Sequence, residues 1–456
     1  MFFEIINKSF WNGSLHVLFY VVNKKTNTEG FHMFKIVSPT KALVKFLLLL
    51  HLRFSEPQQR HLTNFIEALL ACDGTKTIAK LNRLILDATD QSAFTDFFTY
   101  SSWDDDELHR LWQSALVGWV LGDNQLALVP EPFYIGIDDS GSKKPKTSLN
   151  FEVTDWHFDT TEGRGFGYGV VFVTVHIACG KRSTIIALRL YLRARTVRRL
   201  NRAREKNRRL SFKTKFEIVK EILQELAPLI PSKVPVYVLF DSWYASAKLI
   251  KLCRQWGWHV ICALKHNRTF RTPRATEWRQ LSQLARSIRN KDFKEVTVKS
   301  SDSSTRYWVS TLRGRLKGLK DEVSIIISKQ HPKDKRPKFF LVTDLNLTTK
   351  EALSRYMRRW PVEVDHLYLK VRLGLGDFRL RSYEGISKYF DLVGLTLAYL
   401  YWRKGEEQKA DLKTLSDVIA LHRQEQQQAF LRAFGELVLK CGSVDNAIAK
   451  WYKQAA

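Results

Sequence analysis

Two aspartates directly follow short apolar runs of the kind that form β-strands. Asp138 comes after residues 134–137, and Asp241 comes after residues 236–240. Carboxylates at strand ends are common building blocks of sites in α/β proteins. On neighbouring strands the two negative charges would repel each other, and a divalent cation between them would remove that repulsion. The same two acids could instead cap helices or form turns.

Magnesium is the expected cation because it takes oxygen ligands and completes its shell with water and substrate phosphate. Two such ions can activate an attacking oxygen and stabilise the leaving oxygen of a phosphodiester. Asp138 and Asp241 are too few ligands for this task, so a third carboxylate is needed. Asp139 neighbours Asp138 on the opposite strand face. We prefer Asp138 because it directly ends the apolar run, but the choice between the two stays open.

The third carboxylate is predicted in a segment with helical spacing, residues 349–369, in which Trp360 and Pro361 predict a kink or a restart of the helix. Successive spacings of three, four and seven residues separate Tyr356, Arg359, Glu363 and Lys370. Such spacings place side chains near one helical face. This face could hold a metal and a nearby phosphate, because arginine contacts phosphate with two hydrogen bonds and lysine adds a point charge. Taken alone, the spacing of Arg359 and Glu363 is also that of an ordinary ion pair along a helix.

The pattern Tyr-x2-Arg-x3-Glu-x6-Lys resembles the YREK signature of DDE insertion-sequence transposases. Residues 137–144 look like the first catalytic segment of that family, and residues 240–244 look like the second. The helical stretch over residues 60–104 is similar to the domain that precedes the catalytic core. The resemblance covers about residues 57–395, and the YREK pattern is its most specific part.

The resemblance implies an α/β fold with a ribonuclease H-like core and a β-rich insertion between the second Asp and the Glu. A helical domain would precede this core, and C-terminal helices would follow it. The implied catalytic and metal-binding residues are Asp138, Asp241 and Glu363. They would hold two Mg²⁺ ions, for which Mn²⁺ can substitute.

The implied activity is cut-and-paste transposition, in which the enzyme cleaves and joins phosphodiester bonds at the ends of an insertion sequence. Tyr356, Arg359 and Lys370 would bind phosphates at the transposon end. The partners would be double-stranded DNA, as terminal inverted repeats and as target, and a second copy of the chain in a homodimer. One rival is a domesticated ribonuclease H-like DNA endonuclease, which flanking inverted repeats would distinguish from a transposase. Another is a catalytically silent, transposase-derived DNA-binding protein, against which the intact acids argue.

A strong positive charge also favours a nucleic-acid partner. The 456 residues include 73 Lys and Arg against 46 Asp and Glu, for a formal net charge of +27. Phosphates neutralised by such residues release condensed counterions, and this release drives binding. A membrane surface is disfavoured because the basic residues do not line one face of an amphipathic helix.

The densest basic stretch covers residues 193–215, and a solvated loop is the ordinary interpretation of such a run. The net charge of the chain favours a track for the DNA backbone instead. The residues predicted to contact DNA, besides those of the YREK pattern, are Arg198, Arg199, Arg202 and Lys265. Trp243 and Trp360 stand beside catalytic positions and could stack on a displaced base. Burial in the core is the simpler expectation for both.

Five scattered cysteines without a Cys-x-x-Cys pair indicate reduced thiols and a cytoplasmic protein. No export signal or membrane segment is visible. With the resemblance, the expected location is the prokaryotic cytoplasm, in association with the nucleoid.

The elements that position these residues follow from apolar periodicity. Strands are predicted at 133–138, 169–178, 183–192, 236–240, 259–264, 295–299, 307–312, 322–328 and 338–342, with helices at 216–229, 245–256 and from 383 onward. The expected regions are an N-terminal segment without an assigned role (1–56), a helical, DNA-binding domain (57–130), the first part of the core (131–264), the β-rich insertion (265–345), the second part of the core with the Glu helix (346–395) and a C-terminal helical region (396–456).

Overall fold

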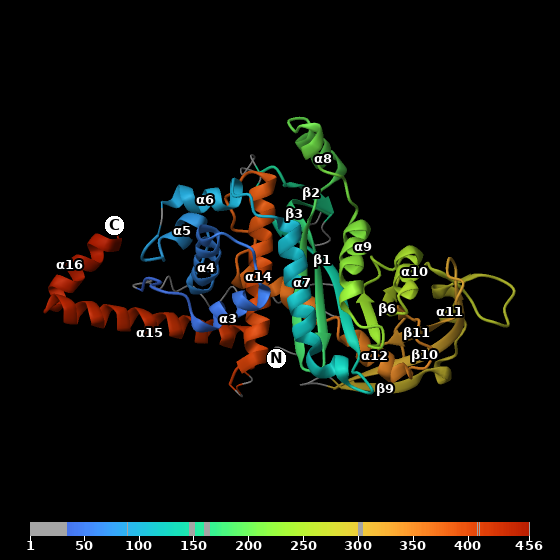
Figure 1. Cartoon of the computed structure of the whole chain (residues 1–456). Coiled ribbons are helices and arrows are strands. Elements are labelled where there is room, and N and C mark those ends of the chain that lie inside the picture. Colours follow the sequence, from blue (N-terminus) through green and yellow to red (C-terminus); the bar gives the residue numbers. More distant parts are fainter. Residues whose placement is uncertain are drawn as a thin grey trace.

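The computed structural model describes residues 34–88, 90–145, 151–158, 165–299, 304–407, 409 and 411–455. These residues form a mixed α/β fold around one large mixed sheet, as the sequence predicts at the level of fold class. Helices near both chain ends gather at one end of the sheet, and β9 to β11 lie at the other end (Figure 1).

The strands, in chain order, are β1 (Phe133–Lys143), β2 (Asp155–Phe158), β3 (Phe166–Cys179), β4 (Arg182–Tyr191), β5 (Val236–Phe240), β6 (His259–Leu264), β7 (Thr269–Arg271), β8 (Arg279–Gln280), β9 (Lys294–Lys299), β10 (Ser304–Leu316), β11 (Val323–Lys329) and β12 (Lys338–Val342). The α-helices are α3 (Lys41–Leu50), α4 (Glu56–Ala71), α5 (Ile78–Asn82), α6 (Gln91–Thr99), α7 (Asp105–Leu121), α8 (Ala194–Asn201), α9 (Lys215–Leu226), α10 (Ala247–Gln255), α11 (Leu281–Ser287), α12 (Thr349–Met357), α13 (Pro361–Leu367), α14 (Tyr383–Glu407), α15 (Leu415–Cys441) and α16 (Val444–Ala455). Short 3-10 turns lie at η1 (Gly122–Leu126), η2 (Lys206–Arg208), η3 (Ala227–Leu229) and η4 (Asn290–Asp292), and η5 (Tyr368–Arg372) is a π-helical turn.

The centre of the sheet is parallel and carries the two predicted aspartates. The strand order is β2-β3-β1-β5-β6-β12-β11-β10-β7-β8, with β4 paired to β3 and β9 to β10. Strands β1, β5 and β6 run parallel, whereas β3 is antiparallel to β1. The pairing of β1 with β5 ends at Ile137 and Phe240. Asp138 within β1 and Asp241 directly after β5 are therefore the residues that follow the last paired residues of two adjacent strands.

The β-rich segment after β6 continues the same sheet. Strands β9 to β12 confirm the four strands predicted there. Strand β12 pairs antiparallel with β6, with Val342 opposite Ile261, and β11 and β10 follow outward. Strand β12 lies beside the parallel strands, so the chain that follows β12 starts next to them. The next helix, α12, accordingly packs against β6.

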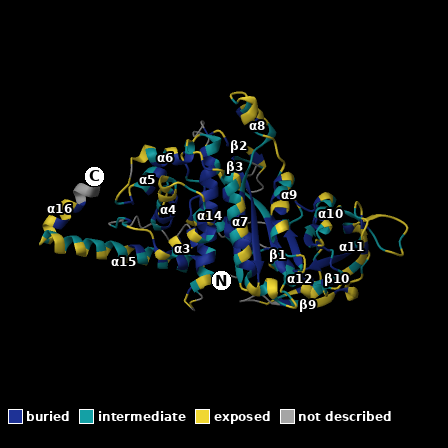
Figure 2. Ribbon diagram, in the orientation of Figure 1, coloured by how far each residue is buried: buried dark blue, intermediate teal, exposed yellow. Residues whose placement is uncertain are grey.

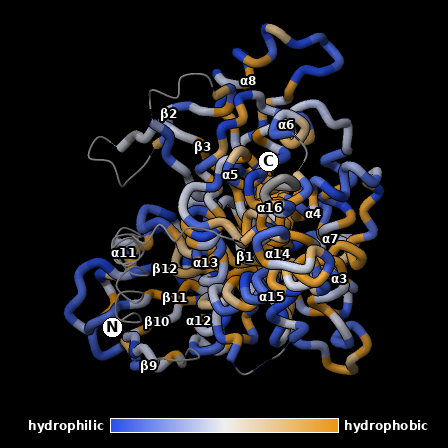
Figure 3. The backbone as a smooth tube through the Cα atoms, turned by 90° about the vertical axis from the view of Figure 1, so that its left-hand side faces the viewer, coloured by the Kyte–Doolittle hydropathy of each residue, from blue (hydrophilic) through white to orange (hydrophobic). Residues whose placement is uncertain are grey.

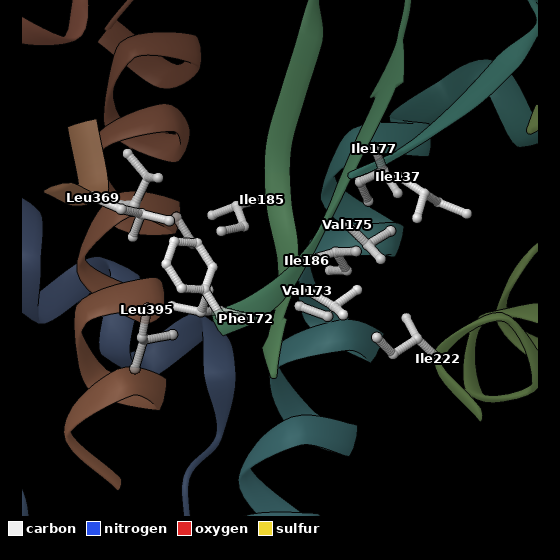
Figure 4. Close-up of a cluster of buried hydrophobic side chains, with 14 of the residues drawn as sticks. Ile137, Phe172, Val173, Val175, Ile177, Ile185, Ile186, Ile222, Leu369 and Leu395 are labelled. Carbon is white, nitrogen blue, oxygen red and sulfur yellow. The ribbon is translucent and has the colours of Figure 1, made fainter. Parts of the chain in front are cut away.

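The central strands bury both of their faces. Figure 4 shows Phe172 of β3 pointing toward Leu395 of α14, whereas its neighbour Val173 lies on the side of Ile222 of α9. Apolar residues on both faces of a strand are expected where helices cover a sheet on each side. The sheet and α14 are the most buried parts of the fold, and the hydropathic colouring places apolar residues along them (Figures 2 and 3).

Helices from the two chain ends pack together through buried charges. Glu67 of α4 lies 2.7 Å from His422 Nε2 of α15, and its other oxygen accepts a hydrogen bond from the backbone of Thr40, the residue that caps α3. Arg403 of α14 pairs with Glu425 of α15. Among the described residues, no helix combines the length and the apolar composition needed to cross a membrane.

The domain boundaries drawn from the sequence stay predictions. Within the segment 1–56, residues 1–33 lie outside the described residues. The described part of this segment contains α3. Helices α4 to α7 share one hydrophobic core with α14 and α15.

One local expectation was wrong. Strand β1 does not end at Asp138 but continues to Lys143, because β3 pairs with it along that whole length. The segment 349–369 is divided into two helices, since α12 ends at Met357 and a new helix begins at Pro361. Proline suits the first position of a helix because its missing N–H would have no partner there, and the restart predicted at this point is confirmed. The basic stretch 193–215 is not a plain loop, because it contains α8.

Candidate active site

A close helix–strand crossing brings the third predicted acid to the sheet. A Cβ atom added to Gly136 of β1 would lie 2.8 Å from Val362 Cγ2 and 3.7 Å from Arg359 Cα. Only glycine therefore lets the start of α13 come so near to β1. The crossing places Arg359 and Glu363 over the strand that carries Asp138.

Arg359 joins two of the three predicted acids. Its Nη1 donates to Asp138 Oδ2 at 2.7 Å, and its Nη2 donates to Glu363 Oε1. The Arg359 side chain is 8% exposed. Buried charges need such partners because removal from water is costly. The pair of Arg359 and Glu363 predicted along the helix is thus present, and Asp138 is added to it from β1.

The acids remain incompletely neutralised. Burial, together with the negative charges of Asp241 and Glu363, raises the pKa of Asp138 to about 7 against the pull of Arg359. Burial also raises the pKa of Asp241. Like charges at one place favour protonation unless a cation arrives. One guanidinium does not balance three carboxylates.

Asp241 is oriented by the turn that follows β5. Its Oδ1 accepts hydrogen bonds from the backbone N–H groups of Trp243, at 2.8 Å, and Tyr244, at 3.4 Å. This is an Asx turn, in which the side chain of Asp closes the loop behind it. The turn keeps Asp241 at the sheet edge and starts the path to α10.

Asp139 has partners of its own on the other side of β1. Its Oδ2 accepts from Lys215 Nζ, and its Oδ1 accepts from Tyr244 Oη at 2.8 Å. Lys215 is the first residue of α9, which begins with a capping box between Thr214 and Glu217. The two adjacent aspartates therefore face different partners, Arg359 for Asp138 and Lys215 for Asp139.

The donor chemistry of the cluster fits a divalent cation, with one condition. Carboxylate oxygens are the ligands that Mg²⁺ prefers, and the pKa values of Asp138 and Asp241 are raised by burial first and by neighbouring negative charges second. Among the described residues, however, no three His, Cys, Asp or Glu side chains already form a group that could hold a metal ion. The Arg359 guanidinium lies between Asp138 and Glu363. These two carboxylates could serve as ligands only once Arg359 releases them.

A buried hydrogen-bond network anchors the helix that carries Glu363. Asp365 is fully buried, and its Oδ2 lies 2.8 Å from His176 Nδ1 of β3. Its Oδ1 accepts from Tyr401 Oη of α14 at 2.7 Å. The next residue, His366, lies 3.2 Å from the Thr174 hydroxyl, and burial lowers its pKa. These contacts fix α13 against both the sheet and α14.

Tyr356 and Lys370 do not lie with Arg359 on one continuous helix. Tyr356 ends up buried at the end of α12, packed against Phe340 with ring centroids 4.9 Å apart, and the Arg359 guanidinium lies 5.9 Å from its ring. Lys370 lies in the π-helical turn η5, half-buried, where its charge helps to lower the pKa of His366. The structure thus places Tyr356 behind Arg359 and Lys370 beyond α13.

The predicted DNA-contacting arginines gather on a projection. Helix α8 stands out from the body of the protein (Figure 1), and Arg198, Arg199 and Arg202 are exposed along it. The base of α8 is held by Asp155 of β2, whose carboxylate accepts from Arg195 and Thr196. The projection is therefore anchored at its base and carries solvent-exposed cations.

Lys265 and Trp243 lie near each other beside the acids. Lys265 is exposed, and its Nζ lies 5.5 Å from the centre of the Trp243 ring. The expectation that Trp243 is buried in the core is wrong, because it is 55% exposed. It stands in the turn that Asp241 closes, which holds its side chain at the surface. Trp360 is half-buried.

Sequence reasoning missed Lys215, Tyr244, His176 and Asp365. Tyr244 stands three residues after Asp241, and this short separation could have predicted that it lies near the acids. Asp365 stands two residues after Glu363, which on a helix indicates a different face and hence an inward one. Lys215 and His176 had no signal, because their partners are distant in the chain.

Comparison with known proteins identifies the family. A family model described as DDE superfamily endonuclease matches residues 50–315, more than half of the chain. The matched segment contains Asp138 and Asp241 and ends before Glu363. No curated protein matches the chain. Membership of such a family implies a nuclease or transposase with DNA as its substrate. The expected relation to DDE enzymes is confirmed, whereas the YREK signature stays a prediction. The chain belongs to the DDE superfamily endonucleases.

Proposed function

We propose that this chain is a DNA transposase that cleaves and joins phosphodiester bonds at the ends of an insertion sequence by a cut-and-paste route. The observation that carries this proposal is the cluster of Asp138, Asp241 and Glu363 around Arg359. An endonuclease of the DDE family needs three acids at one place, and these three come from β1, β5 and α13.

The strand arrangement supports a ribonuclease H-like core for this enzyme. In the strand order β4-β3-β1-β5-β6, the strands β1, β5 and β6 run parallel to one another. Strand β3 is antiparallel to both of its neighbours, β1 and β4. In this proposal β10 to β12 and their neighbours form the β-rich insertion, and α13 returns the chain to the core with Glu363.

Asp138, Asp241 and Glu363 would hold two Mg²⁺ ions, or Mn²⁺ in their place. The ions would activate the attacking oxygen and stabilise the leaving one. Asp138 is preferred to Asp139 because Asp138 shares the Arg359 guanidinium with Glu363, whereas Asp139 pairs with Lys215 and Tyr244. Release of Asp138 and Glu363 by Arg359 would free the Arg359 guanidinium to bind a DNA phosphate, to which its planar fork is suited.

The proposed reaction has two steps of one chemistry. In the first, the oxygen of water bonds to phosphorus while the bond to the 3′ oxygen breaks, and the water proton passes to solvent as the 3′ hydroxyl forms. In the second, the oxygen of that 3′ hydroxyl bonds to the phosphorus of a phosphodiester and gives its proton to solvent, while the bond to a 3′ oxygen of the attacked strand breaks and that oxygen takes up a proton. Neither step needs a covalent enzyme intermediate.

Surface cations are proposed to hold double-stranded DNA, both the terminal inverted repeats and the target. Arg198, Arg199 and Arg202 would contact the backbone from α8, and Lys265 would contact it beside the acids. Tyr356 would act by packing behind Arg359, and Lys370 would bind phosphate from η5.

A homodimer is proposed because two element ends must be joined together. Its support is a set of exposed apolar residues on the arm formed by α15 and α16, namely Leu431, Leu439, Val444 and Ile448.

The test is cleavage of a labelled duplex made from the DNA that flanks the gene, with Mg²⁺ or Mn²⁺. We expect the unaltered protein to nick at the boundary of the repeat. Asp138→Asn, Asp241→Asn and Glu363→Gln should each reduce nicking by roughly ten-thousand-fold, the scale for losing one member of an interdependent group.

Asp139→Asn is the matched control, since it removes the neighbouring charge but not a proposed ligand. It should retain far more activity than Asp138→Asn. Equal loss in both variants would contradict the assignment of Asp138. If all the proteins bind the duplex and none cuts it, the chain is a silent DNA-binding protein. Cutting without regard to the repeat would instead indicate a domesticated nuclease.

A further inference from the structure

A hollow lies between the hairpin of β7 and β8 and the end of β10, in the β-rich segment. Its volume is about 510 Å³. Small-molecule sites in proteins have volumes of roughly 300–1,000 Å³. The hollow is thus large enough for a small ligand. None of its lining residues is acidic, and none belongs to the carboxylate cluster. They are Arg271, Trp278, Arg315, Gly318, Leu319 and Lys320.

Two arginines of this hollow stand directly opposite each other in the sheet. Arg271 of β7 is the antiparallel partner of Arg315 of β10. Directly opposite side chains lie on the same face, and like charges there destabilise a pair of strands. Among the described residues, no carboxylate oxygen lies within 4 Å of the side-chain nitrogens of Arg271, Arg315 or Lys320. An anion held by the two guanidinium groups would remove their repulsion, so the pair favours an anionic ligand.

The backbone fixes the two arginines in this position. Phe270, which precedes Arg271, is fully buried and anchors β7 in the core. The N–H of Lys317 donates to the Thr269 carbonyl oxygen at 2.9 Å. A Cβ atom added to Gly314 would collide with the Arg271 carbonyl oxygen, so only glycine lets β7 come so near to β10. The opposed charges therefore belong to two paired strands and not to a loose surface loop.

Trp278 adds an aromatic wall to the hollow. It directly precedes β8, and the Arg271 guanidinium lies 4.9 Å from the centre of its ring, within the range of cation–π interactions. The residue is nevertheless 38% exposed, so part of the ring is open to a ligand. A ring beside several cations matches a ligand that joins a flat base to phosphates. A base inside a duplex is covered by its neighbours, which favours a free nucleotide over duplex DNA.

We propose that this hollow binds a free nucleoside di- or triphosphate. The phosphates lie between Arg271 and Arg315, with Lys320 as a third cation, and the base stacks on Trp278. Binding involves no covalent step, and it offsets the repulsion between the two arginines. The site goes beyond the proposed transposase activity, because it contains none of the three acids and needs neither DNA nor metal.

The test measures binding of ATP, GTP and pyrophosphate to the whole chain by equilibrium dialysis. EDTA is present, so that no divalent ion links the phosphates to the carboxylate cluster. We expect Arg271→Gln and Arg315→Gln each to weaken ATP binding by roughly 10- to 150-fold, the range for loss of one hydrogen bond to a charged group. Trp278→Ala should weaken ATP binding by roughly 5- to 150-fold, the range for one stacked base, and leave pyrophosphate binding unchanged.

Arg432 provides the matched control, because it is an exposed arginine on α15, far along the chain from the hollow. Arg432→Gln removes the same charge and should leave ATP binding unchanged. Thermal unfolding separates a lost site from a damaged fold. Without ligand, Arg315→Gln should unfold at a temperature no lower than the unaltered protein, since a repulsion is gone. ATP should raise the midpoint of the unaltered protein and not that of Arg315→Gln.

Three results would overturn the nucleotide site. Equal weakening by Arg432→Gln and Arg315→Gln would show that ATP follows the net charge of the chain. Pyrophosphate binding as tight as ATP binding, with no effect of Trp278→Ala on either, would show that no base is recognised. Binding of a short single strand of DNA that depends on Arg271 and Arg315, when ATP binding does not, would assign the hollow to DNA. Each result is obtained without cleavage, so none of them decides the proposed transposase activity.

Discussion

The carboxylate cluster and the arginine-rich projection are both charged regions, and they hold their charges in opposite ways. Arg359 is 8% exposed and joins Asp138 to Glu363, while Asp365 below it joins β3 to α14. On α8, by contrast, Arg198 and Arg202 lie in solvent.

The difference indicates how each region depends on its neighbours. Buried charges share partners, so a change at one of them alters the others and the fold around them. Exposed charges are screened by water and salt, so each acts nearly alone. We therefore expect large, coupled effects in the cluster and small, additive effects on α8, and four predictions test this contrast.

Replacement of Asp365 by alanine should have the largest effect on stability. It leaves His176 and Tyr401 without their buried partner, which should lower the free energy of unfolding by about 3–5 kcal/mol. Denaturant unfolding of the protein without DNA measures this. Asp365→Asn keeps an oxygen for Tyr401 and should cost much less. A change of less than about 1 kcal/mol for alanine would show that the network is not interdependent.

Replacement of Arg359 by glutamine should reduce cleavage by roughly a hundred- to a thousandfold, as for loss of a group that stabilises developing charge. Because Arg359 and Glu363 share an ion pair, the effects of Arg359→Gln and Glu363→Gln should fall well short of additivity in the double variant. Single-turnover cleavage of the labelled duplex measures all three. Strictly additive losses would place the two residues in independent roles.

The proton on Asp138 should set the pH dependence of the metal requirement. Burial raises the pKa of this carboxyl from 3.8 to about 7. Only the folded state holds the proton between these values, so the stability of metal-free protein should fall as pH rises through this window. A metal competes with the same proton, so the Mg²⁺ concentration for half-maximal cleavage should rise by about tenfold per pH unit below 7.

Thermal unfolding midpoints without metal, compared for the unaltered protein and Asp138→Asn across this window, measure the first effect. The variant should lose most of the pH dependence. Identical profiles would mean that Asp138 does not carry the proton.

Substitutions on α8 should have the smallest effects. Arg198→Ala and Arg202→Ala should each weaken DNA binding a few-fold and lower the slope of log affinity against log salt by about 1. Their effects should add in the double variant, in contrast to Arg359 and Glu363. Salt titrations with a fluorescent duplex measure the slopes, and an unchanged slope in both variants would remove α8 from the DNA-binding surface.

Much of the local structure could be predicted from the sequence, because it depends on near neighbours. The bounds predicted for β5, β6 and β12 match the structure, since each is a largely apolar run that a polar residue follows. The helix restart at Pro361 also follows from one residue. Both aspartates could be placed at one sheet edge because the strands that carry them are adjacent and parallel.

Other features depend on distant parts of the chain. The continuation of β1 past Asp138 requires β3 as its partner. The position of Arg359 between two acids requires the close crossing at Gly136. The exposure of Trp243 results from the turn closed by Asp241, and neither composition nor spacing predicts it.

The central claim is that Asp138, Asp241 and Glu363 hold divalent metal, and iron-directed cleavage of the polypeptide tests it most directly. Fe²⁺ takes oxygen ligands, and with ascorbate and peroxide it produces radicals that cut the chain beside the ion. With the flanking duplex bound, we predict cuts near residues 138, 241 and 363, suppressed by excess Mg²⁺ and lost in Asp241→Asn. Cuts confined to other segments, in protein that still cleaves DNA, would contradict the account.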